Sequence, residues 1–228
     1  MASRTDHQKA FISLFKQTAR YQTRYQVFRD FCNCAMAAIH NQHCFSEELE
    51  QYYLKTINKY ERADVDRIVQ LFSHVVFGLA QEPNDFLGSV FMQLELGDKD
   101  LQQFFTPWEV ARMMAKLEMA DISALLQEKP FITLCDPCVG AGCMILAAAE
   151  VLREQGHDPL CSLWVHANDI DPLAAVMAYI QLSLTGIPAA VTIGDALCDT
   201  GKKRTRYTPA HYLGSWSQHL QAVALIAA

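Results

Sequence analysis

Apolar residues recur every three or four positions through the first hundred residues, which is the spacing of one helical face. A single such face is expected over residues 10–31, continuing to residue 41; its apolar positions are Phe11, Leu14, Phe15, Tyr21, Tyr25 and Phe28. The spacing predicts further helices over 46–60, 63–81 and 84–97, with Ser46 and Asn84 as N-caps and Gly97 as the last stop. This part of the chain is expected to form an N-terminal helical domain, residues 1–97.

After residue 97 the pattern changes. A loop over 98–107 leads into a predicted helix over 107–127, with Pro107 near its first position. Short apolar runs at 130–137, 162–171 and 189–197 then alternate with helical runs at 142–156 and 172–186. Strands alternating with helices in this way are typical of a parallel, right-handed α/β sheet. A second, α/β domain is therefore expected over residues 98–228.

Acidic residues stand where each predicted strand ends. Asp136 follows the first strand, Asp169 and Asp171 the second, and Asp195 the third. Ligands of open parallel sheets bind at the carboxyl ends of the strands. An isolated acid there would be best explained as a helix N-cap. Acids at three successive strand ends indicate instead that a nucleotide-like ligand binds at this edge of the sheet.

Composition narrows the class of protein. The chain has 228 residues, 51% of them hydrophobic, and a formal net charge of -6. Any nucleic-acid contact must therefore be local or supplied by a partner, because the chain as a whole is no polycation. No apolar run approaches a membrane span or resembles a signal peptide. We expect a cytoplasmic protein with reduced thiols and no membrane contact.

The nine residues CDPCVGAGC, 135–143, admit three interpretations. A metal site would use Cys135, Cys138 and Cys143, but structural zinc needs four ligands, and the other close pair, Cys32 and Cys34, is remote in sequence. No metal is therefore expected. A nicotinamide or flavin loop needs a third glycine, and position 145 is Ile.

The third interpretation is a loop for S-adenosylmethionine (SAM). Asp136 precedes Gly140 by four positions, where an acid would repel a pyrophosphate and suit an ammonium group. Glycines at 140 and 142 allow close approach of the backbone to a ligand. Asp169 would then serve ribose hydroxyls, and Asp195 the adenine amino group.

Four segments together resemble the N6-adenine DNA methyltransferases, above all the modification subunits of type I restriction systems: QQFFTPWEVARMM, DPCVGAGCMILAAAE, NDIDPLAAVMAYIQLSLTGI and GDAL. The likeness covers residues 84–197 and implies a Rossmann-like SAM-dependent methyltransferase fold. It implies that the methionine end of SAM meets Phe105, Thr106 and Pro107, and that the amino acid meets Asp136, Pro137, Cys138, Gly140, Ala141 and Gly142. It also implies ribose contacts from Asp169, a secondary or capping role for Asp171, and adenine contacts from Asp195 and Ala196.

The sequence departs from that family's pattern at one point. The family ends its next strand in Asn/Asp-Pro-Pro-Tyr/Phe, which holds and stacks on a flipped-out adenine. This sequence has no such motif, and later strands and a target-recognition domain are also missing, so that the α/β domain reads as truncated. No catalytic residue is assigned.

The segment after Asp195 carries two further candidates for nucleic-acid contact. Tyr212 and Trp216, with His219 beyond, are either an aromatic shelf for a base or the buried face of a terminal helix. The basic stretch Lys202, Lys203, Arg204 and Arg206 either contacts phosphates or forms a solvated loop. His211 is better explained as structural than as a general base.

The expected function is transfer of the SAM methyl group to an adenine of DNA. The first alternative is a catalytically silent SAM-binding module, or one half of a split methylase that works with a separate specificity or catalytic subunit. An RNA or protein methyltransferase, and more remotely a dehydrogenase, also remain open.

Overall fold

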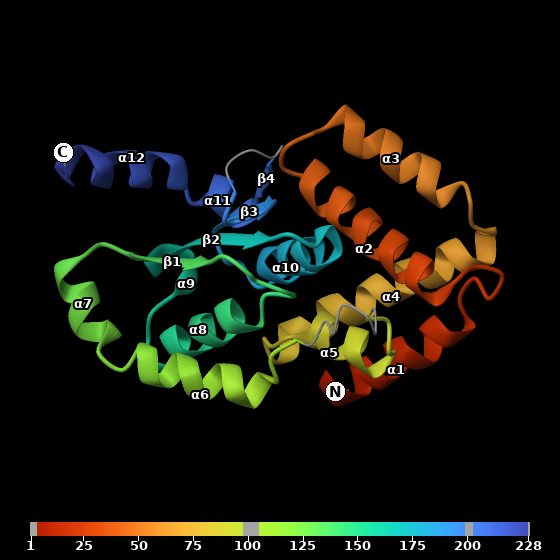
Figure 1. The fold of residues 1–228 in the computed structure, drawn as a ribbon, viewed down its shortest axis with the longest axis horizontal. Coiled ribbons are helices and arrows are strands. Elements are labelled where there is room, and N and C mark those ends of the chain that lie inside the picture. Colours follow the sequence, from red (N-terminus) through yellow and green to blue (C-terminus); the bar gives the residue numbers. More distant parts are fainter. Residues whose placement is uncertain (1–3, 98–104, 199–202, 228) are drawn as a thin grey trace.

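The computed structural model describes residues 4–97, 105–198 and 203–227, and it shows a mixed α/β fold preceded by a helical region (Figure 1). The helical region comprises α1 (Arg4–Gln17), α2 (Arg24–Asn41), α3 (Glu47–Ile57), α4 (Arg62–Gln81) and α5 (Phe86–Gln93). Its centre is a cluster of buried aromatic rings from α1, α2 and α5, in mutual contact at centroid distances of 5.4–6.3 Å: Phe11, Phe15, Phe28, Phe31, Phe86 and Phe91. The predicted helical region is confirmed.

The single helical face expected over residues 10–31 is wrong, because two helices share that run. α1 ends at Gln17, Ala19 adopts a φ of 44°, and Thr23 caps α2 by accepting from the Gln26 N–H. The Arg24 guanidinium donates to the carbonyls of Phe15, Thr18, Ala19 and Gln22. One of these carbonyls belongs to the last turn of α1 and three to the turn that follows it, so the Arg24 side chain stabilises the break between the two helices.

Two other helix limits differ from the sequence prediction. Ser46 caps α3 as expected, but Asp85 rather than Asn84 caps α5. The run 107–127 divides into α6 (Trp108–Glu118) and α7 (Ile122–Glu128). The Gln155 side chain donates to the Met119 carbonyl at 3.0 Å, so a tertiary contact satisfies the backbone where α6 ends. Periodicity alone does not reveal such a contact.

The sheet has the predicted parallel core. β1 (Ile132–Asp136), β2 (Leu163–Asp169) and β3 (Ala189–Ile193) are parallel and adjacent in that order. They are connected through α8 (Cys143–Glu154), α9 (Pro159–Ser162) and α10 (Pro172–Leu184). β4 (Arg204–Tyr207) pairs antiparallel with β3, so that the alternative of a solvated loop is wrong for these four residues. α11 (Pro209–Leu213) and α12 (Trp216–Ala227) follow.

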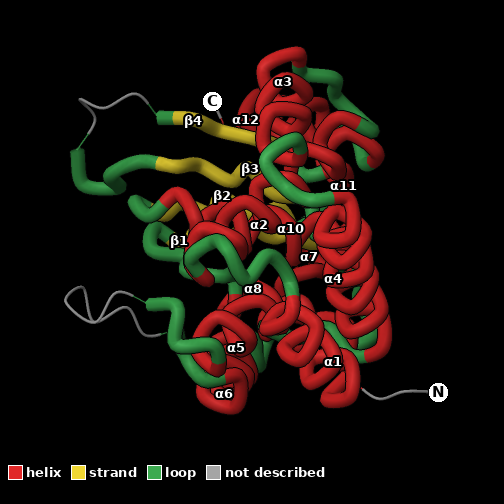
Figure 2. Tube along the Cα trace, turned by 90° about the vertical axis from the view of Figure 1, so that its right-hand side faces the viewer, coloured by secondary structure: helices red, strands yellow, loops and turns green. Residues whose placement is uncertain are grey.

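One face of this sheet carries most of the packing. α10 is buried along nearly its whole length, because it lies between the sheet and α2, with α8 beside it (Figures 1 and 2). On the other face Thr133, Cys135 and His166 are exposed. β2 and β3 are therefore better buried than β1, which stands at the edge of the sheet.

A single contiguous set of buried side chains runs from Phe11 in α1 to Val191 in β3. The helical region and the sheet thus share one core, and a division into two domains at residue 97 stays a prediction. No helix among the described residues is long and apolar enough to cross a membrane.

Candidate functional site

The strand ends bring the predicted acids to one edge of the sheet. Asp136 is the last residue of β1 and pairs in register with Ala167, while Asp169 is the last residue of β2. A hollow with a volume of about 300 Å³ opens beside them. It is lined by Phe105, Thr106, Asp136, Cys138, Val139, Gly140, Ala141, Cys143, Met144 and Asp169. Seven residues predicted for the ligand site therefore come together around one hollow.

The loop between β1 and α8 depends on its two glycines. Gly140 has a φ of 57° and Gly142 a φ of 97°, the left-handed region that side chains disfavour. A Cβ at Gly140 would also lie 3.1 Å from the Phe105 ring. The Phe105 ring therefore rests directly on the loop at the hollow.

Asp169 fastens this loop to the end of β2. Its Oδ2 accepts from the Gly140 N–H at 2.8 Å, and its Oδ1 accepts from the Asp171 N–H at 2.9 Å. A carboxylate offers about four lone-pair positions, so two hydrogen bonds leave further acceptor capacity. Asp169 can thus hold the loop and still accept hydrogen bonds from hydroxyl groups of a ligand.

Asp136 lies beside the same loop and is half-buried. Its Oδ1 accepts from the Cys138 N–H at 3.1 Å. Burial raises the pKa of Asp136, the hydrogen bond from Cys138 lowers it, and the nearby charge of Asp169 raises it again. Two neighbouring carboxylates in a partly desolvated place favour a cationic ligand group, which would relieve their repulsion.

Asn168 connects the three strand ends, and the sequence analysis missed it. Its Nδ2 donates to the carbonyls of Pro137 at 3.2 Å and Gly194 at 2.9 Å. The backbone carbonyl of Asn168 accepts from the Val139 N–H at 2.8 Å. No pattern in the sequence marked this role, because only the fold shows that the amide is buried and that both of its donors have acceptors there.

The remaining residues predicted for the ligand site are not part of the lining of the hollow. The carboxylate of Asp171 caps α10 by accepting from the Leu173 N–H at 2.8 Å. The carboxylate of Asp195 accepts from the Leu197 N–H at 2.9 Å, and that hydrogen bond lowers its pKa. Asp195 and Ala196 are exposed just beyond β3. The predicted residues that are not part of the lining are Pro107, Pro137, Gly142, Asp171, Asp195 and Ala196.

Comparison with known sequences decides the family. The model of the family described as N-6 DNA Methylase matches residues 85–217, which include every residue that lines the hollow and also α5 of the helical region. The chain belongs to the N-6 DNA methylase family. The resemblance predicted from the four sequence segments is confirmed at this level.

Two solved structures are similar to part of this chain. A protein described as a class I S-adenosylmethionine-dependent methyltransferase from Listeria monocytogenes is 16% identical, over 78% of this chain and 55% of its own, with a TM-score of 0.44. The methyltransferase subunit of a type I restriction-modification system from Streptococcus thermophilus is 18% identical, over 70% of this chain and 38% of its own, with a TM-score of 0.32. The present chain thus spans less than two thirds of either protein. No curated protein sequence matches it.

The cysteines of this methylase-family loop have separate environments. Cys135 and Cys138 are exposed, whereas Cys143 is buried and its thiol donates to the Thr106 carbonyl at 3.3 Å. Burial raises the pKa of Cys143 to about 12. Among the described residues, no three His, Cys, Asp or Glu side chains form a possible metal site. The thiol of Cys143 instead fixes the 105–107 segment against the start of α8.

Neither Tyr212 nor Trp216 is part of the lining of the hollow in this methylase-family chain. Trp216 is 2% exposed, packs edge-on against Phe131 at 4.9 Å, and donates its indole N–H to the Leu160 carbonyl. Phe131 and Leu160 precede β1 and β2, so Trp216 lies at the amino ends of the strands. Its ring is therefore not available for stacking on a base, and the buried face of a terminal helix is the better interpretation.

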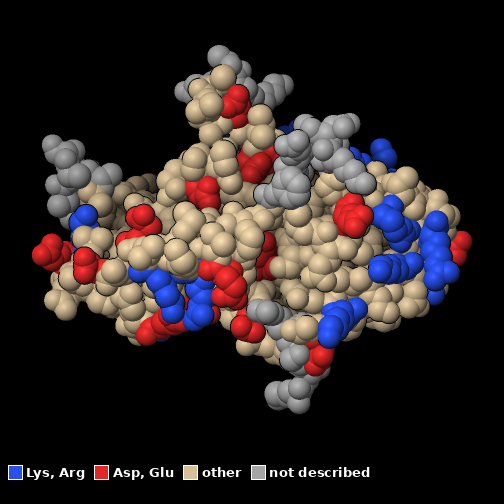
Figure 3. Space-filling model, turned by 60° about the horizontal axis from the view of Figure 1, so that its bottom comes forward, with Lys and Arg blue, Asp and Glu red and all other residues tan. Residues whose placement is uncertain are grey.

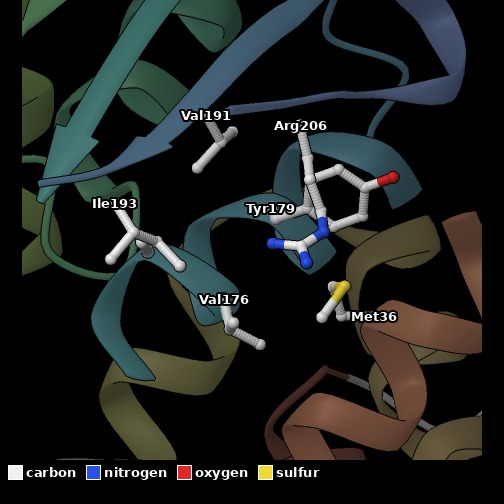
Figure 4. Close-up of a pocket in the computed structure, with 7 residues that line it drawn as sticks. Met36, Val176, Tyr179, Val191, Ile193 and Arg206 are labelled. Atoms are coloured by element: carbon white, nitrogen blue, oxygen red, sulfur yellow. The ribbon is translucent and has the colours of Figure 1, made fainter. Parts of the chain in front are cut away.

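The basic stretch forms the edge strand β4, apart from Lys202, which lies outside the described residues, and Lys203 just before the strand. Arg204 is exposed, whereas the Arg206 side chain turns inward across Tyr179 toward Met36 and Val176 (Figure 4). Burial lowers the pKa of Arg206. Lys203 and Arg204 are thus better placed than Arg206 to meet a phosphate.

Charges on the face drawn in Figure 3 are mixed, with acidic groups spread between the basic ones. The densest basic group on that face lies at the right-hand end, where Figure 1 places the turn between α1 and α2 and the start of α4. Exposed basic side chains from those segments include Lys16, Arg20 and Arg62. Positive charge is therefore local, as the net charge of -6 requires.

Proposed function

We propose that this chain binds SAM at the carboxyl edge of its sheet and transfers the methyl group to the amino nitrogen of an adenine in DNA. One observation carries the proposal. In a member of the N-6 DNA methylase family, a glycine loop and two strand-end carboxylates, Asp136 and Asp169, border one hollow. This arrangement suits a ligand with a cationic amino acid at one end and ribose hydroxyls at the other.

The residues around the hollow fit such a ligand by type and position. Asp136 would hold the ammonium group. Its Oδ1 already accepts from the Cys138 N–H, and the carboxylate keeps further lone pairs that can accept from the ligand. Asp169 would accept from the ribose hydroxyls. Asp195 and Ala196 would meet the adenine, and Phe105, Thr106 and Pro107 would cover the methionine end. SAM would supply an electrophilic methyl group, and the chain's task would be positioning and exclusion of water.

DNA is the proposed substrate on the strength of the family. Its approach would be helped by local positive charge, including Lys203 and Arg204, and a separate specificity or catalytic subunit is the proposed partner. The chain carries no Asn/Asp-Pro-Pro-aromatic sequence, so the group that holds the target adenine is not assigned to any of its residues.

Calorimetry with SAM tests the binding half of the proposal. The wild-type protein should bind SAM with a micromolar or lower Kd, and Asp136→Ala and Asp169→Ala should abolish the heat of binding. Asp66→Ala is a suitable control, because this exposed α4 carboxylate only pairs with Arg62 on the surface. Absence of heat with SAM, together with binding of NAD, would overturn the proposal.

A second candidate function is that of a SAM-binding half of a methylase, completed by another chain. The observation that favours it is the position of β1, which stands at one end of the four-stranded sheet, so that among the described residues its edge away from β2 pairs with no strand. An unpaired strand edge is a template for a further strand. Radiolabelled SAM with unmethylated DNA separates the two functions: label in adenine supports the enzyme, and SAM binding without transfer supports the half-methylase.

A further inference from the structure

The side-chain amide of Gln181 in α10 connects the ligand loop to the helical region. Gln181 is fully buried. Its Nε2 donates to the Ala141 carbonyl in the loop at 2.7 Å and to Asp85 Oδ1 at 2.9 Å. Its Oε1 accepts from the Leu87 N–H in the first turn of α5 at 2.9 Å. One side chain therefore contacts both the loop and the start of α5.

The orientation of this amide is fixed by its partners. Both N–H groups have acceptors, and the carbonyl has a donor. Exchanging the nitrogen and oxygen would place Oε1 against two acceptors, Asp85 and Ala141, and the amine against the Leu87 N–H. No water-exposed alternative exists for a side chain buried in this way, so the amide has one satisfied arrangement.

Asp85 in turn holds the amide in place. Its Oδ1 accepts from both Gln181 and the Gly88 N–H, the latter at 2.8 Å. Gly88 allows this approach, because a Cβ there would lie 2.1 Å from Asp85 Oδ2. The carboxylate is buried and belongs to the cap of α5, so it cannot move without disturbing that helix.

The loop needs such a tether. Gly140 and Gly142 both adopt left-handed backbone conformations, and glycine has many alternatives to them. Asp169 and Asn168 fix the loop at Gly140 and Val139, on the side facing the strands. Gln181 fixes it at Ala141, on the side facing the helices.

We infer that Gln181 is a positioning residue for the SAM loop, held by Asp85, and that it makes the affinity of the hollow depend on the start of α5. The SAM part of this inference rests on the proposed function. The tether itself does not, because it concerns the mobility of residues 138–142 in the protein alone.

Hydrogen exchange of the loop amides tests the tether directly. The N–H groups of Cys138, Val139, Gly140 and Gly142 are all hydrogen-bonded and serve as probes. Gln181→Leu keeps the volume and removes all three hydrogen bonds. It should speed exchange across 138–142 by about tenfold, the effect expected of one lost hydrogen bond. If the wild type binds SAM, the affinity of the variant should fall by a similar factor.

Two controls separate positioning from general destabilisation. Leu71→Ala removes a fully buried side chain of α4 and lowers the melting temperature without touching the network. Compared at the same interval below their melting temperatures, only Gln181→Leu should show the fast loop. Asp85→Asn keeps an acceptor at Oδ1 and should leave loop exchange at the wild-type rate.

Equal loop exchange in Gln181→Leu and Leu71→Ala would overturn the inference. So would an unchanged SAM affinity in folded Gln181→Leu. If the wild type fails to bind SAM, the proposed function falls, while the exchange experiment still decides whether Gln181 holds the loop.

Discussion

The loop at the ligand site requires a residue without a side chain at position 140. The φ of Gly140, 57°, is left-handed, and a Cβ would meet the Phe105 ring at 3.1 Å. We expect Gly140→Ala to reduce the free energy of unfolding by about 1–2 kcal/mol, the cost of a left-handed residue with a side chain. SAM binding should weaken as well, because Phe105 or the loop must shift.

Gly156 provides the matched control for that substitution. It also has a positive φ, of 83°, but nothing lies within 4 Å of its would-be Cβ. Gly156→Ala should therefore lose similar stability in urea unfolding, with the calorimetric Kd for SAM unchanged. A Kd that moves equally in both variants would contradict the role given to the Phe105 contact.

Single residues also mark the limits of sequence interpretation. Asp136, Gly140 and Asp169 were identifiable because a strand end, a glycine pair and an acid each leave a pattern in the chain. Asn168 and Gln181 left none, because each acts through partners far away in sequence. Trp216 left two interpretations open, since an aromatic residue in a terminal segment has the same sequence pattern whether it stacks on a base or packs in the core.

At the scale of elements, α5 is capped by the buried carboxylate of Asp85, and ionising a buried carboxylate lowers the stability of the fold. Burial raises the pKa of Asp85, and hydrogen bonds from Gln181 and Gly88 offset part of that effect. A pKa raised in the folded state stabilises the fold below the unfolded value of about 3.9 and loses that contribution as the pH rises through the folded pKa. The charge of Asp85 therefore weakens the fold at neutral pH.

Asp85→Asn should consequently be more stable than the wild type at pH 7, because it keeps the acceptor without the buried charge. The difference should shrink as the pH falls through the folded pKa and level off below about pH 3, where Asp is mostly protonated even when unfolded. Urea unfolding at a series of pH values measures this. A constant difference at every pH would show that the carboxyl does not titrate as described.

The elements themselves were largely predictable, and the exceptions have physical causes. The three parallel strands and their helices follow from alternating apolar runs. The break between α1 and α2 depends on Arg24 reaching back to four carbonyls, and the break after α6 on Gln155. β4 was missed because Arg204–Tyr207 has little apolar content, and only pairing with β3 makes it a strand.

At the scale of the whole molecule, the shared core predicts a single unfolding transition. The three tryptophans, Trp108, Trp164 and Trp216, all lie beyond residue 97, so their fluorescence reports on the α/β part. Far-UV circular dichroism also reports on the long helices α1, α2 and α4. The two signals should give coincident urea curves, since α10 packs on both α2 and the sheet.

Separate transitions would be the contrary result. Helical signal lost at a different urea concentration from the fluorescence change would support independent domains divided near residue 97. In that case the buried surface between α2 and α10 would contribute less to stability than its extent indicates.

The contact of Asp85 with Gly88 has a consequence for related sequences. The carboxylate occupies the space that a side chain at 88 would need, and its other partner is the amide of Gln181. Positions 85, 88 and 181 should therefore vary together among homologues. A homologue with a smaller residue at position 85 would have room for a side chain at position 88 and would not need an amide at position 181. Substitutions at these three positions should therefore occur together.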